Sequence, residues 1–223
     1  MIRWIERLMQ RRPKLSAAEA YALWAPGYPP HAHNRLMELE ERAVLELLPE
    51  VQGCAALDLA CGTGRYLKML CERGALPAVG LDASAPMLRR ARAVSANLVQ
   101  ADLCSLGLRP ASFHLITCAL AVGHVIDLRS ALLEIRGVLA PKGILVYSDF
   151  HPLGALLGWR RTFCGDDKRE YEIRHHTHLF SDHVAACAAV GLRIEDVREP
   201  RIDFGKRWRG YPAVLVIRAC RMD

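Results

Sequence analysis

LDLACGTGRY, residues 57–66, has the pattern of a buried strand that turns through two glycines directly into a helix. Glycines at such a turn, Gly62 and Gly64, let a ligand approach the backbone closely, and the start of the helix offers free N–H donors. We therefore expect a nucleotide-like ligand at this turn. The dinucleotide fingerprint G-x-G-x-x-G needs a third glycine where this chain has Leu67, and the acid Asp58 precedes the loop, so an NAD site is disfavoured.

Short apolar runs alternate with amphipathic stretches from about residue 55 onward. This rhythm predicts a parallel sheet with helices on both faces. Beyond it, a helix is expected with Ser181 or Asp182 as its N-cap, and two final strands with only a loop between them favour an antiparallel hairpin. The expected strands are 55–60, 78–82, 98–102, 113–120, 143–150, 193–198 and 213–220, and the expected helices are 17–23, 33–48, 65–73, 85–94, 128–139 and 181–190.

Acidic residues accompany three successive strands of this pattern. Asp82 ends the second strand in VGLDASAPML, where a carboxylate is placed to accept hydrogen bonds from a ribose diol. Asp102 ends the third strand in VQADL, and Asp58 lies in the first. The alternative is that these acids only cap helices and form turns. Together with the glycine turn, they favour an adenosine-type ligand.

These segments resemble the class I S-adenosylmethionine-dependent methyltransferases, particularly the broad type 11 group that includes ubiquinone and menaquinone methyltransferases. The resemblance covers roughly Tyr21 to the C-terminus and rests on LDLACGTGRY, GLDASAPML, VQADL, FHLITCALAVGHV, EIRGVLAPKGILVYSDF and AAVGLRIEDVREP. It implies a Rossmann-like seven-stranded α/β sheet of order 3-2-1-4-5-7-6 with its last strand antiparallel, and an N-terminal helical lid. The family usually has Asp early in the fourth strand, where this chain has His114, and we expect a packing change there without loss of cofactor binding.

The resemblance implies S-adenosylmethionine as the cofactor and assigns its contacts by position. The turn at 60–64 would hold the methionine part and Asp82 the ribose hydroxyls, while Ala83 and Met87 would pack near the adenine and Asp102 would recognise its amino edge. The expected cofactor-binding residues are Asp58, Ala60, Cys61, Gly62, Gly64, Asp82, Ala83, Met87, Asp102, Leu103, Ala119 and Leu120.

Two histidines are candidate catalytic residues. The methyl donor is already an activated sulfonium, so the protein must chiefly align an acceptor lone pair and exclude water. A base is needed when the acceptor is protonated, as a hydroxyl usually is. His124 follows the fourth strand and His151 the fifth, and histidine titrates near neutrality. Alternatively, His124 is a loop residue that contacts the cofactor and His151 a turn residue before Pro152.

The acceptor pocket is expected in the insertion at 151–180. If HHTH, residues 175–178, is extended, alternation puts His176 and His178 on one face, where they would contact the substrate. An ordinary surface strand and a metal cluster are the alternatives, but the histidine spacing does not match H-E-x-x-H and we expect no metal. Arg160 and Arg161 in GWRRTF would bind an acidic substrate group or lie in a solvated basic turn.

A lid is expected at residues 21–35, YALWAPGYPPHAHNR, where related enzymes cover the cofactor. Tyr21, Trp24, Tyr28 and His33 would close over the methyl-transfer centre, and Tyr28 and His33 would contact the acceptor. The alternative is that Trp24 and the tyrosines only anchor the first helix on the sheet.

Composition bounds the remaining properties. The chain has 223 residues, 52% hydrophobic and 24% charged, which excludes a disordered or collagen-like chain. We expect one domain over 1–223, with N-terminal helices and lid at 1–50, a cofactor-binding core at 51–150, the acceptor-pocket insertion at 151–180, and a helix and hairpin at 181–223.

The 8 cysteines never form C-x-x-C, and the charges near the N-terminus do not suit a secretory signal, so a cytoplasmic protein with reduced thiols is expected. Apolar residues recur at helical spacing over residues 2–9. No membrane anchor is visible, and the oligomeric state is open, monomer or homodimer.

The leading hypothesis is methyl transfer to an oxygen or nitrogen of a small molecule, in specialised or cofactor metabolism. The net charge of +6, the basic segment RRPK at 11–14 and the loop GKRWRGY at 205–211 motivate a rival, methylation of RNA or protein, although nucleic acid is not the expected partner. A non-catalytic cofactor-binding protein is the third possibility.

Overall fold

The computed structural model describes residues 12–223, so the helical pattern expected at residues 2–9 lies outside the described residues. The strands are β1 (Lys14–Leu15), β2 (Ala56–Leu59), β3 (Ala78–Asp82), β4 (Leu98–Gln100), β5 (Phe113–Cys118), β6 (Leu139–Phe150), β7 (Thr162–Cys164), β8 (Glu170–Ile173), β9 (Leu192–Arg198) and β10 (Val214–Arg221). The helices are α2 (Ala17–Trp24), α3 (Arg35–Leu47), α4 (Arg65–Glu72), α5 (Ala85–Ala91), α6 (Leu128–Val138), α7 (Pro152–Leu156) and α8 (Phe180–Val190), with the short 3-10 helices η1 (Ala25–Gly27) and η2 (Val122–His124).

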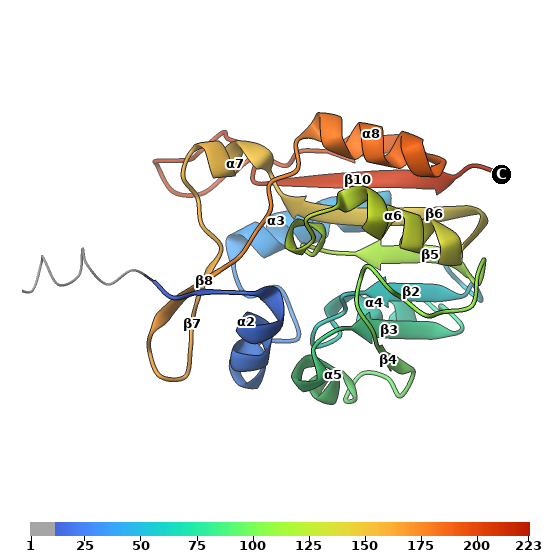
Figure 1. The fold of residues 1–223 in the computed structure, drawn as a ribbon, viewed down its shortest axis with the longest axis horizontal. Helices are drawn as coiled ribbons and strands as arrows, with labels where there is room; N and C mark the ends of the chain where they lie inside the picture. Colours follow the sequence, from blue (N-terminus) through green and yellow to red (C-terminus); the bar gives the residue numbers. More distant parts are fainter. Residues whose placement is uncertain (1–11) are drawn as a thin grey trace, which may run out of the picture.

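The main sheet is seven-stranded, with the order β4-β3-β2-β5-β6-β10-β9 (Figure 1). Strands β4, β3, β2, β5 and β6 pair in parallel, and β10 runs antiparallel to both β6 and β9. Numbered by these strands alone, the order is 3-2-1-4-5-7-6. The expected α/β fold with a reversed last strand is therefore confirmed.

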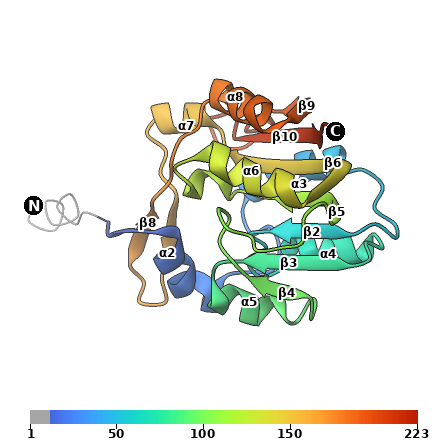
Figure 2. The same cartoon turned by 45° about the vertical axis from the view of Figure 1, so that its right-hand side comes forward.

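Helices cover both faces of this sheet, as strands that are apolar on both sides require. All four residues of β2 are buried. Helices α3 and α4 contribute to one hydrophobic cluster, while α6 and α8 contribute to the other, on the opposite face (Figure 2). Among the described residues, no helix is long and apolar enough to cross a membrane.

The start of α8 differs from the expectation that Ser181 or Asp182 is its N-cap. The helix begins at Phe180 with Leu179 as N-cap, and the Leu179 backbone N–H donates to the Asp182 carboxylate at 2.7 Å. Asp182, in the first turn of α8, therefore accepts the hydrogen bond of a backbone N–H at the start of the helix. A carboxylate there also interacts favourably with the helix dipole.

A second, three-stranded sheet of order β1-β8-β7 combines one strand of the N-terminal segment with two strands of the 151–180 insertion, at residues where no strand was expected. Strands β7 and β8 form a hairpin, and β1 from the N-terminal segment pairs in parallel with β8, Lys14 opposite Glu172 and Leu15 opposite Ile173. Figures 1 and 2 both show this sheet and α2 beside the carboxyl ends of the main strands. The lid region is thus tied to the insertion.

Candidate active site

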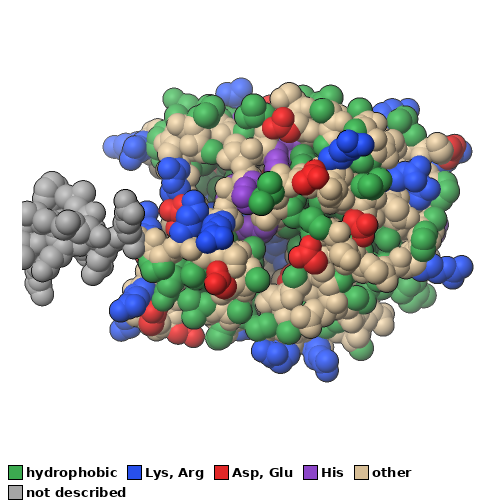
Figure 3. All heavy atoms as spheres, viewed as in Figure 1, with side chains coloured by type: hydrophobic (Ala, Val, Ile, Leu, Met, Phe, Trp, Pro, Cys, Tyr) green, Lys and Arg blue, Asp and Glu red, His purple; other side chains and the backbone are tan. Residues whose placement is uncertain are grey.

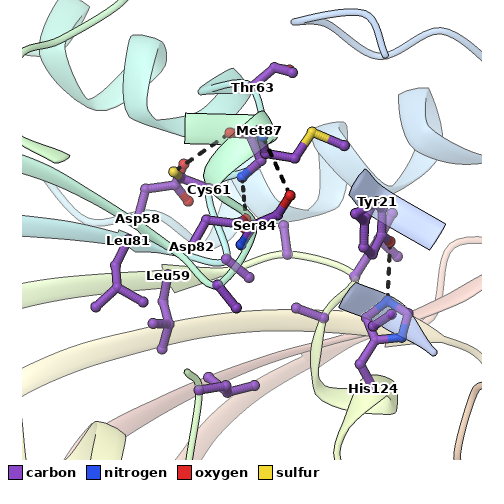
Figure 4. Close-up of a pocket in the computed structure, with 18 of the residues that line it drawn as sticks. Tyr21, Asp58, Leu59, Cys61, Thr63, Leu81, Asp82, Ser84, Met87 and His124 are labelled. Atoms are coloured by element: carbon purple, nitrogen blue, oxygen red, sulfur yellow. Dashed lines mark hydrogen bonds between the residues drawn. The ribbon is translucent and has the colours of Figure 1, made fainter. Parts of the chain in front are cut away.

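A cavity of about 210 Å³ opens where the carboxyl ends of β2, β3 and β5 meet α2 (Figure 4). Ligands of open α/β sheets bind at this edge. Figure 3 shows histidine side chains gathered in a hollow of the molecule, with basic side chains nearby. The expected cofactor residues that line the cavity are Asp58, Ala60, Cys61, Gly62, Asp82, Ala83, Met87, Asp102, Leu103, Ala119 and Leu120.

The turn after β2 has a strained backbone that faces this cavity. Ala60 has φ 56° and Gly62 φ 55°, and a Cβ on Gly62 would meet nothing within 4 Å. Gly64, the N-cap of α4 with φ 93°, does not line the cavity, and a Cβ there would lie 3.1 Å from Val94 Cγ2. Gly62 thus leaves its backbone open to a ligand, and Gly64 lets the helix pack closely.

Asp58 stabilises the turn through hydrogen bonds to α4 and β5. Its carboxylate accepts hydrogen bonds from the Leu67 backbone N–H at 2.8 Å and from Thr117 Oγ1 at 2.9 Å. Burial raises the pKa of Asp58 to about 7, against the opposing effect of these two hydrogen bonds. Asp58 therefore fixes the start of α4 relative to β2 and β5, although its surface also borders the cavity.

Asp82 stands at the end of β3 with its carboxylate oxygens on the turn. One oxygen accepts from Gly62 N at 2.8 Å and the other from Ser84 N at 2.7 Å. Burial raises the pKa of Asp82, while these two hydrogen bonds oppose the rise. A carboxylate has about four lone-pair positions, so acceptor capacity remains for two hydroxyl groups.

The part of the cavity near α5 and the end of β4 is lined by apolar residues and one carboxylate, that of Asp102. Met87 is 1% exposed, at a position in α5 fixed by the Ser84 cap. Leu103 lines the same wall, and Asp102 accepts from Cys104 N at 2.8 Å. Apolar side chains beside a carboxylate suit a purine with an exocyclic amine, and Asp82, which has acceptor capacity for a ribose, lines the same cavity. The residues present therefore fit S-adenosylmethionine.

Glu40 of α3 is a buried residue that sequence reasoning missed. It is 0% exposed, and its carboxylate accepts from Arg65 at 2.8 Å, Tyr66 Oη at 2.9 Å and Ser148 Oγ at 2.6 Å. Ser148 in turn accepts from Leu120 N at 2.9 Å. This network joins α3, α4 and β6 beneath the cavity, and no local motif signals contacts over such sequence distances.

His124, one of the two candidate catalytic residues, lies in the cavity wall with Tyr21 and Arg161. His124 Nε2 is 3.1 Å from Tyr21 Oη, and Nδ1 is 3.3 Å from the carbonyl oxygen of Arg174. Because a carbonyl only accepts, Nδ1 carries the proton and Nε2 accepts from the tyrosine. Burial, with the charge of Arg161, lowers the pKa of His124 to about 3. His124 is therefore neutral at physiological pH.

Arg161, which the sequence suggested with Arg160 as a residue that would bind an acidic substrate group, connects these groups. Its Nη1 donates to the Leu120 carbonyl at 2.8 Å and its Nη2 to Tyr21 Oη at 2.7 Å. Leu120 is held at φ 52°, a backbone strain of the kind that gathers at functional sites. Burial raises the pKa of Tyr21, although the charge of Arg161 opposes the rise. Tyr21 therefore remains a neutral hydroxyl.

His151, the other candidate, lies outside this cavity. It caps α7, where its Nδ1 accepts from Leu153 N at 3.2 Å, and its Nε2 is 3.0 Å from Glu199 Oε1. His151 instead borders a second cavity, which the structure places beside the first and which shares Arg161 with it. The position after β6 thus put His151 near the site, but α7 turns its ring toward Glu199.

The HHTH segment alternates as expected, but the other face meets the cavity. His175 and Thr177 line the second cavity, and His176 and His178 line neither. His178 Nε2 is 3.0 Å from the Val125 carbonyl oxygen. Across residues 12–223, no three His, Cys, Asp or Glu side chains come together as a metal-binding group.

The lid residues lie in one aromatic cluster. Trp24 stacks on Phe163 of the hairpin at 4.8 Å between ring centroids and contacts Tyr28 at 4.7 Å. Tyr28 lines the cofactor cavity, whereas His33 packs on Tyr28 at 5.3 Å between ring centroids and lines neither cavity.

Arg160, an expected anion-binding residue, borders the second cavity, 3.9 Å from Glu172. His114 is exposed at the start of β5, away from the site.

Comparison with known proteins points to the same chemistry. Residues 57–147 match a family model described as a methyltransferase domain. A malonyl-[acyl-carrier protein] O-methyltransferase of Enterobacter lignolyticus is 33% identical over 137 residues, covering 60% of this chain and 53% of the relative. A demethylmenaquinone methyltransferase of Thermus thermophilus is 36% identical over 118 residues, covering 50% and 54%. This chain thus spans about half the length of these curated relatives.

A solved structure extends the likeness over most of the fold. The crystal structure of an S-adenosylmethionine dependent methyltransferase from Mesorhizobium loti superposes with a TM-score of 0.68 at 26% identity, and the match covers 82% of this chain and 98% of that chain. Its fold and the family match agree with the geometry at the ends of β2 and β3. Residues 57–147 are therefore a methyltransferase domain, within the fold of the class I S-adenosylmethionine-dependent methyltransferases.

Proposed function

We propose that this chain transfers the methyl group of S-adenosylmethionine to an oxygen or nitrogen of a small molecule in the cytoplasm, in specialised or cofactor metabolism. The observation that carries the proposal is the Asp82 carboxylate at the end of β3, inside a cavity that adjoins a second cavity of about 700 Å³. In the first cavity, the carboxylates of Asp82 and Asp102 would accept hydrogen bonds from a nucleoside, and the backbone of the turn at 60–64 would donate to its substituent. The second cavity has room for a small acceptor.

The cofactor would be held by residues of three strand ends. Asp82 would bind the ribose hydroxyls, the turn at 60–64 the methionine part, and Met87 with Asp102 and Leu103 the adenine. Bound there, S-adenosylmethionine supplies a methyl group on a sulfonium, which needs no further activation. Ala119 and Leu120 would line the end of this site.

The chain's own residues then align the acceptor and exclude water. Tyr21 and Tyr28 line the cavity from the N-terminal segment, and Thr63 Oγ1 donates to the Pro29 carbonyl at 3.2 Å, which joins that segment to the turn. Preorganised positioning of this kind accounts for a large part of catalysis in reactions with an activated donor. Arg160, at the edge of the second cavity and 3.9 Å from Glu172, would add to the positive charge that attracts an acidic acceptor.

The acceptor of the relatives does not decide the acceptor of this chain. One relative is named for malonyl-[acyl-carrier protein] and the other for demethylmenaquinone. For nucleic acid, the loop at 205–211 offers Trp208, but this ring packs on Trp159 at 5.6 Å and lines the second cavity. A small-molecule acceptor is therefore the better-supported partner.

The proposed function is tested by measuring first cofactor binding and then methyl transfer. We expect calorimetry to detect binding of S-adenosylhomocysteine, and mass spectrometry to detect methyl transfer from S-adenosylmethionine to members of a panel of phenols, carboxylic acids and amines. Preferential binding of NAD would refute the proposal. Cofactor binding with no transfer to any acceptor would favour a non-catalytic protein, and salt-sensitive RNA retention with RNA methylation would favour the rival substrate.

A further inference from the structure

The second cavity has an aromatic wall and lies against the cofactor site. It has a volume of about 700 Å³ and shares Arg161 with the first cavity. Its aromatic residues are Phe150, Trp159, Phe204 and Trp208. Large flat side chains from separate segments of the chain favour a ligand with an aromatic body.

A buried carboxylate orients a histidine of this cavity. His175 Nε2 lies 2.9 Å from Asp149 Oδ1, and Asp149 is 4% exposed. Burial acts to raise the pKa of Asp149, but the hydrogen bond and charge of His175, with the charge of Arg161, outweigh it and lower the pKa. The carboxylate accepts the Nε2–H, and the described residues offer Nδ1 of His175 no hydrogen-bond partner, so the neutral ring can accept a proton there.

The chain makes room for this pair at Gly123. A Cβ at Gly123 would lie 2.1 Å from His175 Nε2 and 2.3 Å from Asp149 Oδ2. The carbonyl of Gly123 also accepts from His176 N at 2.7 Å, which anchors the backbone next to His175. The backbone of η2 at Gly123 thus packs closely against the His175–Asp149 pair, with no space for a larger side chain.

The other histidines near the site are poorly suited to accept a proton. Nε2 of His124 is held by Tyr21 Oη, and its burial keeps it neutral. Both ring nitrogens of His151 have partners, Leu153 N and the Glu199 carboxylate. His175 alone among these three combines a free ring nitrogen with a carboxylate that would stabilise its cation.

Arg161 supplies positive charge beside the pair. Its guanidinium lies 4.9 Å from the Phe150 ring centroid, and the His175 ring lies 5.7 Å from the same ring. Two of its five N–H groups donate to the Leu120 carbonyl and Tyr21 Oη, which leaves donors for a ligand. Within residues 12–223, no carboxylate forms an ion pair with it, whereas Lys14 and Arg160 both pair with Glu172.

We propose that the acceptor is an aromatic hydroxyl compound, with His175 as the base, Asp149 as its positioning residue and Arg161 as the binding site of the oxyanion. This inference rests on the proposed function and narrows its acceptor. The O–H bond of the acceptor breaks as its proton moves to His175 Nδ1, while the Nε2–H of His175 remains hydrogen-bonded to the Asp149 carboxylate. The acceptor oxygen then bonds to the methyl carbon as the carbon–sulfur bond breaks, and sulfur keeps the electron pair.

The experiment uses 4-nitrophenol as the probe, because its phenolate absorbs at longer wavelength than the phenol. The probe is titrated with pH in the presence of the protein and S-adenosylhomocysteine, so that no methyl transfer occurs. The groups facing His175 are Asp149, Arg161 and His124. We expect the bound probe to ionise at least about one pH unit below the free probe, a tenfold preference for the phenolate.

Variants separate the roles. His175→Gln keeps a donor for Asp149 but accepts no proton, and with S-adenosylmethionine it should lower turnover of a weakly acidic phenol, unsubstituted phenol itself, by about a hundredfold or more. The loss of turnover in the His175→Gln variant should be smaller for more acidic phenols, because they need the base least. Arg161→Gln should abolish the spectral shift, and Arg161→Lys should retain part of it. The matched controls, His114→Gln and Arg169→Gln at exposed positions, should match the wild type.

The outcomes distinguish this inference from the proposed function. Absence of S-adenosylhomocysteine binding would contradict the proposed function itself. Normal cofactor binding with unshifted probe ionisation would overturn the acceptor assignment alone, as would a His175→Gln variant with wild-type turnover of phenols of every acidity. Tight binding of 2-naphthamide equal to that of 2-naphthol would exclude an oxyanion site at Arg161.

Discussion

Two aspartates on neighbouring strands have different tasks although both accept two hydrogen bonds. Asp58 bonds to Leu67 N and Thr117 behind the turn, so its acceptor positions serve the fold. Asp82 bonds to Gly62 N and Ser84 N at the cavity wall, where it can also accept from a ligand. The difference follows from the side of the turn on which each carboxylate lies.

Replacement of Asp82 should therefore affect ligand binding more than folding. We expect Asp82→Ala to weaken binding of S-adenosylhomocysteine at least about tenfold, or 1.4 kcal/mol, because charge-assisted hydrogen bonds to a diol are lost. Calorimetry measures the affinity and circular dichroism checks the fold. Asp167→Ala in the exposed β7–β8 loop is the control, and unchanged affinity in a folded Asp82→Ala protein would remove the ribose assignment.

His124 should act as a neutral positioning group. Its pKa of about 3 makes its cation a poor product of proton transfer, so His124→Gln should change turnover by less than about tenfold, with the same factor from pH 6 to 9. Pre-steady-state kinetics over this pH range measures the effect. A hundredfold loss that removes an ionisation near pH 6.5 would instead identify His124 as the base that its place after β5 suggested.

At the scale of elements, local sequence patterns predicted most of the residues that line the first cavity, whereas among the expected acceptor-binding residues only Tyr28, Arg160 and Arg161 line a cavity. The turn at 60–64 and Asp82 lie within two strand–turn–helix units, whose patterns are visible in short windows. Arg161 and Tyr21 are 140 residues apart, and His175 and Asp149 are 26 apart. Such pairs exist only once the β1-β8-β7 sheet folds the insertion back over the main sheet.

Alternation in HHTH was correctly expected, but its direction was not. Extended chain places alternate residues on opposite faces, and nothing in HHTH itself says which face meets a cavity. The backbone bond from His176 N to the Gly123 carbonyl sets the register and turns His175 inward. The decisive information thus lies in η2, about fifty residues earlier in the chain.

Two glycines of η2 and α6 provide a matched test of this packing. Gly123→Ala should lower the free energy of unfolding by about 1–3 kcal/mol, because its Cβ would overlap His175 and Asp149. Gly137→Ala should raise it by about 0.5–1 kcal/mol, since a Cβ at this helical position meets nothing within 4 Å. Urea denaturation measures both, and a Gly123→Ala protein as stable as the wild type would contradict the close packing.

The contact of α2 with the β7–β8 hairpin should control the local stability of the lid. Trp24 stacks on Phe163 and contacts Tyr28 edge to face, so Trp24→Ala should increase amide hydrogen exchange in residues 16–28 more than in β2 or β5. Leu23→Ala, at a 40% exposed neighbour on the same helix, is the control. Equal increases in α2 and in the central strands would mean that the tryptophan stabilises the whole fold instead.

For the whole molecule, buried titratable groups act on stability in opposite directions. His124 and His183 have lowered pKa values, about 3 and about 4, so the unfolded chain binds their protons first as the pH falls below 6.5. Their contribution to stability is present above pH 6.5 and lost on acidification. Asp58, with its pKa raised to about 7, takes up a proton in the folded state first and opposes the loss.

His183 allows one of these contributions to be isolated, because it lines neither cavity and burial is the main cause of its lowered pKa, which the charge of Asp149 opposes. It is 2% exposed and its Nδ1 lies 3.1 Å from Tyr147 Oη, a contact that Asn can replace. Between pH 6.5 and about 4, the wild-type free energy of unfolding should lose up to about 1.4 kcal/mol per pH unit through this residue. His183→Asn should remove that part of the slope while Asp58 and His124 keep theirs. Urea denaturation at half-unit pH steps measures both slopes, and parallel curves for the two proteins would show that His183 ionises equally in the folded and unfolded states.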